Sequence, residues 1–140
     1  MREARLDTPP TLGVAFQDAD HEESVNGFNT LMEAVEAAAA DPDRLSAAVT
    51  AMSDYVDHTR AHFGREEEAM QAAGFPPYPM HKQAHDSTLQ DLETMLGRLR
   101  AGEAEACRDW LARDFITWFH EHLASMDTVT ADFLRENGYG

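Results

Sequence analysis

The sequence predicts an all-α protein: an antiparallel up-down-up-down four-helix bundle with an irregular N-terminal arm. Apolar residues recur at helical spacing in four segments, short turn-forming stretches separate these segments, and no useful length alternates with the period of a strand. The composition of 43% hydrophobic residues, with only 8 Gly and 6 Pro in 140 residues, is typical of one folded helical domain. We assign residues 1–17 to the arm and residues 18–140 to a single bundle domain.

The first two helices are predicted by their apolar faces and by the residues at their ends. Asp18 is placed to cap the first helix, which should stop before Asp41, and Pro42 can open the second helix at its first position. The inward face of the first helix carries Val25, Phe28, Leu31, Met32 and Val35. The second carries Leu45, Val49, Met52, Val56, Phe63 and Met70. It should run to Gly74, where the sequence "GFPPYP" predicts a tight proline-rich connection.

The third and fourth helices are predicted in the same way. The third begins near Met80 and ends at Ala101 and Gly102, with one stripe formed by Leu89, Leu92, Leu96 and Leu99. The fourth carries Trp110, Leu111, Phe115, Trp118, Leu123 and Val129. Because the connections are short, neighbouring helices should run antiparallel.

The charge and the apolar runs exclude several classes of protein. A net charge of -15 repels phosphate backbones and anionic lipid surfaces, so we expect neither nucleic acid nor a membrane as partner. No apolar run approaches the roughly 18 residues that a spanning helix needs, and the N-terminus lacks an apolar signal-peptide core. The single Cys107 allows no internal disulfide, which fits a reducing compartment. We therefore expect a cytoplasmic protein, and a monomer because no further apolar stripe remains.

Residues able to bind metal recur on the inward faces of all four predicted helices. Positions four apart on a helix are separated by only about 40° of rotation, so His62 shares a face with Glu66, and His81 with His85. Glu67 and Glu68 should turn to solvent. A single pair of metal-binding residues four apart occurs by chance on many helices. Such residues on all four predicted helices together are harder to explain by chance. The full set is His21, His62, Glu66, His81, His85, His122 and Asp127.

Five imidazoles and two carboxylates in an apolar core would lack hydrogen-bond partners unless they bound something. Seven ligands are too many for one tetrahedral zinc ion and too rich in nitrogen for calcium or magnesium. A pair of transition metals bridged by the two carboxylates is the natural interpretation. Iron, manganese and zinc all suit this ligand set.

Four motifs, "DADH", "HFGREEEAM", "HKQAH" and "WFHEHLASMD", resemble in order and spacing the signature of the hemerythrins, most closely the single-domain bacteriohemerythrins. The match covers nearly the whole chain after the first dozen residues. The resemblance implies a non-haem di-iron site, oxo- or hydroxo-bridged, that binds dioxygen reversibly for transport, storage or delivery. It assigns His21 and His62 to one iron, His81, His85 and His122 to the other, and Glu66 and Asp127 to both as bridges.

The resemblance also implies apolar walls around the bound oxygen, with Phe63, Trp118 and Leu123 as the matching residues. Ser24 departs from the family pattern, which places a bulky apolar residue there, and could admit water or donate a hydrogen bond. His122 and Asp127 are five apart, about 140° out of register on a regular helix, so a π-type turn is predicted between them. His58 shares a face with His62, and His120 should face solvent; neither enters the ligand set.

Two other classes of function remain as alternatives. A di-iron oxidase on a ferritin-like bundle needs inward Glu-x-x-His pairs, which this sequence does not contain, so we expect an oxygen-binding protein and not an enzyme. Side activity as an oxidase or peroxidase, or scavenging of peroxide or nitric oxide, would use the same site. An oxygen or redox sensor would have to act through a separate protein partner, which oxygen delivery could also require.

Overall fold

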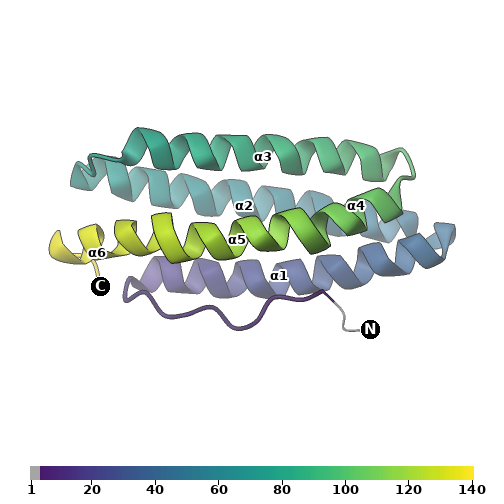
Figure 1. Cartoon of the computed structure of the whole chain (residues 1–140), viewed down its shortest axis with the longest axis horizontal. Helices are drawn as coiled ribbons and strands as arrows, with labels where there is room; N and C mark the ends of the chain where they lie inside the picture. Colours follow the sequence, from purple (N-terminus) through teal and green to yellow (C-terminus); the bar gives the residue numbers. More distant parts are fainter. Residues whose placement is uncertain (1–3) are drawn as a thin grey trace.

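The computed structural model describes residues 4–140 and consists of four long helical segments packed side by side (Figure 1). The first three are α1 (Ala15–Ala40), α2 (Leu45–Ala73) and α3 (Tyr78–Arg100). The fourth runs through α4 (Ala104–Trp110), η2 (Leu111–Phe115), α5 (Ile116–His122), η3 (Leu123–Asp127) and α6 (Thr128–Glu136). A short turn of 3₁₀ helix, η1 (Pro42–Arg44), leads into α2. The predicted all-α four-helix bundle is confirmed, and no strand occurs within residues 4–140.

The first helix begins earlier than predicted. It starts at Ala15, so the boundary predicted after residue 17 falls inside α1, and Asp18 is not its capping residue. The Asp18 carboxylate instead accepts the backbone N–H groups of Leu12 at 2.7 Å and Gly13 at 3.1 Å. Asp18 therefore closes the turn that leads into α1 from within the helix.

The N-terminal arm lies along α1, below it in the view of Figure 1. The side-chain amide of Asn29 pairs with the backbone of Leu6: its oxygen accepts the Leu6 N–H at 2.8 Å, and its nitrogen donates to the Leu6 carbonyl at 2.9 Å. The Leu6 side chain is buried in the main core. The part of the arm that the structure describes is thus packed against the bundle, while residues 1–3 of the predicted arm lie outside the described residues.

The connections between helices follow the turn residues closely. The Asp41 carboxylate accepts the Asp43 N–H at 3.0 Å, with Pro42 opening η1. Gly74 ends α2 with φ +71°, a left-handed conformation that residues with a side chain adopt at a cost. The third helix begins at Tyr78, two residues before the predicted Met80.

The apolar core is divided between two clusters on either side of a polar layer. The larger cluster lies near the η1 turn and includes Phe28, which stacks on Phe115 with ring centroids 5.5 Å apart. The smaller cluster lies at the other end and comprises Val14, Ala69, Ala131 and Leu134. The predicted metal ligands occupy the bundle between these two clusters, where helix packing fixes their backbones.

The last helix contains two widened turns of π type, η2 and η3. The extra residue in η3 shifts every later side chain around the helix by about 100°. Val129, predicted to face inward, is consequently 53% exposed, while the neighbouring Thr130 is fully buried. Across residues 4–140, no helix is both long enough and apolar enough to cross a membrane.

Candidate metal centre

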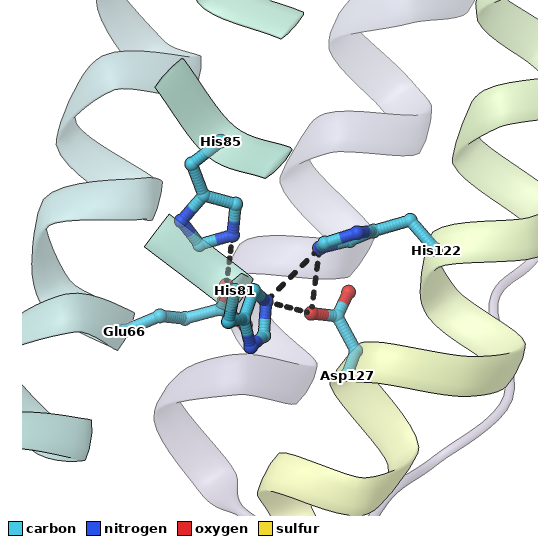
Figure 2. Close-up of side chains that lie close together, drawn as sticks. All are labelled: Glu66, His81, His85, His122 and Asp127. Carbon is cyan, nitrogen blue, oxygen red and sulfur yellow. Dashed lines mark hydrogen bonds and ion pairs between the residues drawn. The ribbon is translucent and has the colours of Figure 1, made fainter. Parts of the chain in front are cut away.

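All seven predicted ligands are buried, none more than 7% exposed, and they converge in the polar layer of the bundle. Each helical segment contributes: His21 from α1, His62 and Glu66 from α2, His81 and His85 from α3, His122 from α5 and Asp127 from η3. Figure 2 shows five of them, from α2, α3 and the fourth segment, pointing toward one another. The spacing of four within α2 and α3 is what places two ligands of each helix on one face.

The larger group of ligand atoms comprises Glu66, His81, His85, His122 and Asp127, with all ligand atoms within 4.8 Å of one another. Asp127 Oδ1 lies 3.2 Å from His81 Nε2 and 3.1 Å from His122 Nε2. Glu66 Oε1 lies 3.2 Å from His85 Nε2 (Figure 2). Three imidazole nitrogens and two carboxylate oxygens therefore surround one point.

The smaller group comprises His21, His62 and Glu66. His21 Nε2 lies 3.6 Å from Glu66 Oε2, and His62 Nε2 lies 3.4 Å from Glu66 Oε1. The second oxygen of Asp127, Oδ2, lies 3.2 Å from His21 Nε2. Glu66 thus belongs to both groups, and Asp127 presents one oxygen to each, as two bridging carboxylates would.

Several of these buried atoms have no hydrogen-bond partner within residues 4–140. They are both ring nitrogens of His21, Nδ1 of His62, Nε2 of His85, Oε1 of Glu66 and Oδ1 of Asp127. An unpartnered buried polar group costs roughly 1–3 kcal/mol, and more if charged, so the arrangement is unfavourable on its own. The donor set of imidazole and carboxylate fits divalent transition-metal ions, which would satisfy those atoms that face the centre of the cluster, namely Nε2 of His21 and His85, Oε1 of Glu66 and Oδ1 of Asp127.

The charges within the cluster are strongly coupled. Burial lowers the pKa of His21, but the nearby carboxylates of Asp127 and Glu66 outweigh it and raise this pKa to about 10. Burial raises the pKa of Glu66, yet the charge of His62 and the histidines around it bring this pKa well below its usual value. Burial and Glu66 also raise the pKa of Asp127, but the close approach of His122, His21 and His81 lowers it overall. Both carboxylates are therefore ionised and ready to bind cations at neutral pH.

The π-type turn predicted between His122 and Asp127 is confirmed as η3. The Thr128 hydroxyl donates to the Leu123 carbonyl at 2.8 Å, and the Ser125 hydroxyl donates to the Glu121 carbonyl at 2.6 Å. These side chains satisfy carbonyls that the widened turn exposes. The turn brings Asp127, only 4% exposed, onto the same face as His122.

Three residues that contact the ligands were not identified from the sequence as part of the site. Thr130 Oγ1 lies 2.8 Å from His81 Nδ1, and the Gln17 side-chain amide donates to Glu66 Oε2 at 2.8 Å. Glu67 was predicted to face solvent, which is wrong: its carboxylate lies 2.9 Å from His85 Nδ1 and is 17% exposed. Helix α3 packs against this side of α2, so the Glu67 side chain meets His85 instead of solvent. The only sequence signal for Gln17 is its position four residues before His21 on the same face.

A small cavity of about 30 Å³ borders the smaller ligand group. Its lining includes His21, Ser24, Tyr55, Thr59, His62, Phe63, Phe115, Trp118, Phe119, His122 and Asp127. Phe63 stacks on His85 with centroids 3.8 Å apart, and Trp118 stacks on His122 at 4.5 Å. Of the four predicted oxygen-pocket residues, Ser24, Phe63 and Trp118 line this cavity, whereas Leu123 is buried but does not.

The two remaining histidines lie outside the cluster. His120 is exposed, as predicted. His58 is half-buried, and its Nε2 lies 3.4 Å from the Ser24 hydroxyl. The cavity is therefore separated from a solvent-accessible histidine by one serine side chain.

The fold and the site together define a four-helix-bundle protein with a buried histidine and carboxylate cluster able to bind metal. Residues 12–134 match the model of the hemerythrin HHE cation-binding domain, and the chain belongs to the hemerythrin family. The observed ligand cluster lies entirely within the matched residues.

Several hemerythrins are similar to this chain. A bacteriohemerythrin of Ralstonia nicotianae is 33% identical over 127 residues, which cover 91% of this chain and 85% of that protein. A bacteriohemerythrin of Aquifex aeolicus is 28% identical over 125 residues, 88% of this chain and 91% of that protein. A myohemerythrin of Sipunculus nudus is 34% identical over 62 residues, 44% of this chain and 52% of that protein. No solved structure matches the chain.

Proposed function

We propose that this chain binds dioxygen reversibly at a pair of iron ions held in the polar layer of the bundle. The observation that carries the proposal is the presence of two overlapping ligand groups that share Glu66 and are both faced by Asp127. His21 and His62 would hold one ion, and His81, His85 and His122 the other. Membership of the hemerythrin family supports this assignment.

Two ferrous ions in this ligand set would supply the open coordination position and the two electrons that reversible dioxygen binding requires. The imidazoles are neutral ligands, so the two carboxylates contribute all of the negative charge of the protein ligands. Two ionised carboxylates offset only part of the charge of two divalent cations. Such a set favours the reduced metals more than one rich in carboxylates would.

The side chains around the cavity support binding at the metal held by His21 and His62. Both of these histidines line the cavity, whereas only His122 of the three histidines in the larger group does so. The aromatic rings of Phe63 and Trp118 form part of its apolar wall and exclude water. A dry pocket protects bound oxygen from the protons that would let it leave in reduced form.

The visible absorption spectrum of the iron-loaded protein tests this function directly. The protein is reduced without oxygen, exposed to air and then purged with inert gas. A band that appears with oxygen and disappears on purging is the expected result. A single irreversible change to an oxidised spectrum would contradict reversible binding, and a protein that takes up no iron would contradict the assignment of the metal.

We further propose that the chain serves oxygen transport, storage or delivery, as a cytoplasmic monomer, and not catalysis. The absence of any Glu-x-x-His pair in the sequence disfavours a ferritin-like oxidase. Delivery or sensing would engage a protein partner, and a pull-down repeated with and without oxygen tests for one. Sedimentation of the iron-loaded chain tests the monomer.

A further inference from the structure

Gln17 is the one side-chain amide that donates a hydrogen bond to a proposed bridging carboxylate within residues 4–140. It is fully buried, and its amide nitrogen lies 2.8 Å from Glu66 Oε2. The amide oxygen of Gln17 has no partner in the described part of the chain. A glutamine placed in this way is costly to bury, which indicates that its hydrogen bond serves the site.

The first turn of α1, which carries Gln17, is anchored from several directions. The Ala15 N–H donates to the Gly140 carbonyl at 2.9 Å, and Val14 is fully buried in the smaller core cluster. The Asp18 carboxylate holds the N–H groups of Leu12 and Gly13. The start of α1 is thus fixed against the C-terminus of the chain, and Gln17 has little freedom to move away from Glu66.

The hydrogen bond selects one orientation of the Glu66 carboxylate. Oε2, held by Gln17, is the oxygen nearest His21, whereas Oε1 lies near His62 and His85. In this orientation Oε2 faces the smaller group and Oε1 lies near histidines of both groups, so the carboxylate can bridge two metals. A carboxylate that is free to turn can bind a single metal through both oxygens, which would withdraw a ligand from the smaller group.

We infer that Gln17 is a positioning residue that holds Glu66 in the bridging orientation and thereby secures the metal bound by His21 and His62. This role rests on the proposed two-metal function and concerns the metal of the smaller ligand group. Hydrogen bonds from outer residues orient metal ligands, and their loss typically costs 10- to 100-fold in metal affinity. Because the smaller group has fewer protein ligands, the loss should fall mainly on its metal.

The test uses Gln17→Met, which keeps the length and flexibility of the side chain but removes the donor. Gln71→Met, at an exposed position of α2, is the matched control. Co²⁺ is the probe, titrated into metal-free protein and followed by visible absorption. Wild type and control should bind two equivalents, whereas Gln17→Met should bind the first with unchanged affinity and the second about tenfold or more weakly.

A second measurement identifies which of the two metals is bound more weakly. In protein with one equivalent of Zn²⁺, the imidazole NMR signals of His81 and His85 should shift in Gln17→Met, while those of His21 and His62 keep their metal-free positions. Thermal unfolding of the metal-free variants distinguishes a loss of fold stability from a change confined to the orientation of the Glu66 carboxylate. Equal weakening of both metals together with a lower Tm would assign Gln17 a merely structural role, and two unchanged affinities would also overturn the inference.

Failure of the proposed function would give a different result from failure of the inference about Gln17. Wild-type protein that bound fewer than two equivalents would refute the two-metal centre itself, and the inference with it. Gln17→Glu gives an independent check, because a carboxylate facing Glu66 should repel it. The second Co²⁺ should then bind at least as weakly as in Gln17→Met, whereas wild-type affinity in Gln17→Glu would contradict a role for the donor.

Discussion

The two halves of the metal centre differ in how their histidines are supported. In the half formed by His81, His85 and His122, two imidazoles have partners on their outer nitrogen: Thr130 contacts His81, and Glu67 contacts His85. In the other half, Nδ1 of His21 and of His62 has no hydrogen-bond partner in the described residues. Outer partners fix ring orientation and raise ligand basicity.

The two halves also differ in their surroundings. The cavity of about 30 Å³ borders both histidines of one half, His21 and His62, but only His122 of the other, where the face of His85 is covered by the stacked ring of Phe63. One half is therefore closed and well supported, and the other is open and lightly supported. The comparison indicates that the closed half holds its metal firmly while the open half leaves room for a ligand.

The largest effect should follow from removing the carboxylate that both halves share. Glu66→Gln keeps the size of the side chain but removes the charge that faces two metals, so both should be lost, with affinities lowered about 100-fold or more. Iron content after desalting measures this. Glu68→Gln, at an exposed position two residues along α2, is the control and should retain two irons per chain. Two irons retained in Glu66→Gln would contradict a shared bridge.

A smaller and one-sided effect should follow from removing support in the closed half. Glu67→Gln replaces the carboxylate beside His85 Nδ1 with an amide, and metal affinity of this half should fall about tenfold while the other half is unchanged. The exposed Glu22→Gln is the control. Competition with a chelator measures both affinities. Equal weakening of the two halves would show that Glu67 does not act through His85.

The helices could be predicted from sequence because their apolar periodicity is a local property, but regular periodicity fails at η3. Val129 was assigned to the core by counting along an ideal helix, and one extra residue in η3 moved Thr130 into that place. A π-type turn is already required for Asp127 to face the same way as His122. The same turn moves Val129 off the inward face of the helix. A π-type turn therefore changes the predicted face of everything that follows it.

The ligands were recognisable from spacing and motif, whereas most of their partners were not. His62 and Glu66 lie on one helix, so their common face follows from rotation alone. Glu67 lies on the solvent side by the same rotation, yet α3 covers it and brings His85 to it. The contact of Gln17 with Glu66 joins α1 to α2 and depends on how the start of α1 is anchored, which no single helix reveals.

The pH dependence of metal uptake should distinguish the halves further. The raised pKa of His21, about 10, means that His21 carries a proton at pH 7 in the metal-free protein, and a metal must displace it. Affinity of the open half should therefore rise with pH between about 6 and 9, by about tenfold per pH unit for one proton displaced. Proton release during Zn²⁺ titration in weak buffer measures this. No release at pH 7 would contradict a protonated His21.

The smallest effect concerns the opening of the cavity toward solvent. Ser24 lines the cavity, and its hydroxyl lies 3.4 Å from Nε2 of the half-buried His58, so it gives water and protons a polar route to the open half. Ser24→Leu should close this route and slow autoxidation of the oxygenated protein several-fold, measured as decay of its visible band. Ser87→Leu, exposed on α3, controls for the added apolar side chain. An unchanged rate in Ser24→Leu would show that water reaches the open half by another path, and the polarity of the cavity wall would then have no bearing on how long oxygen stays bound.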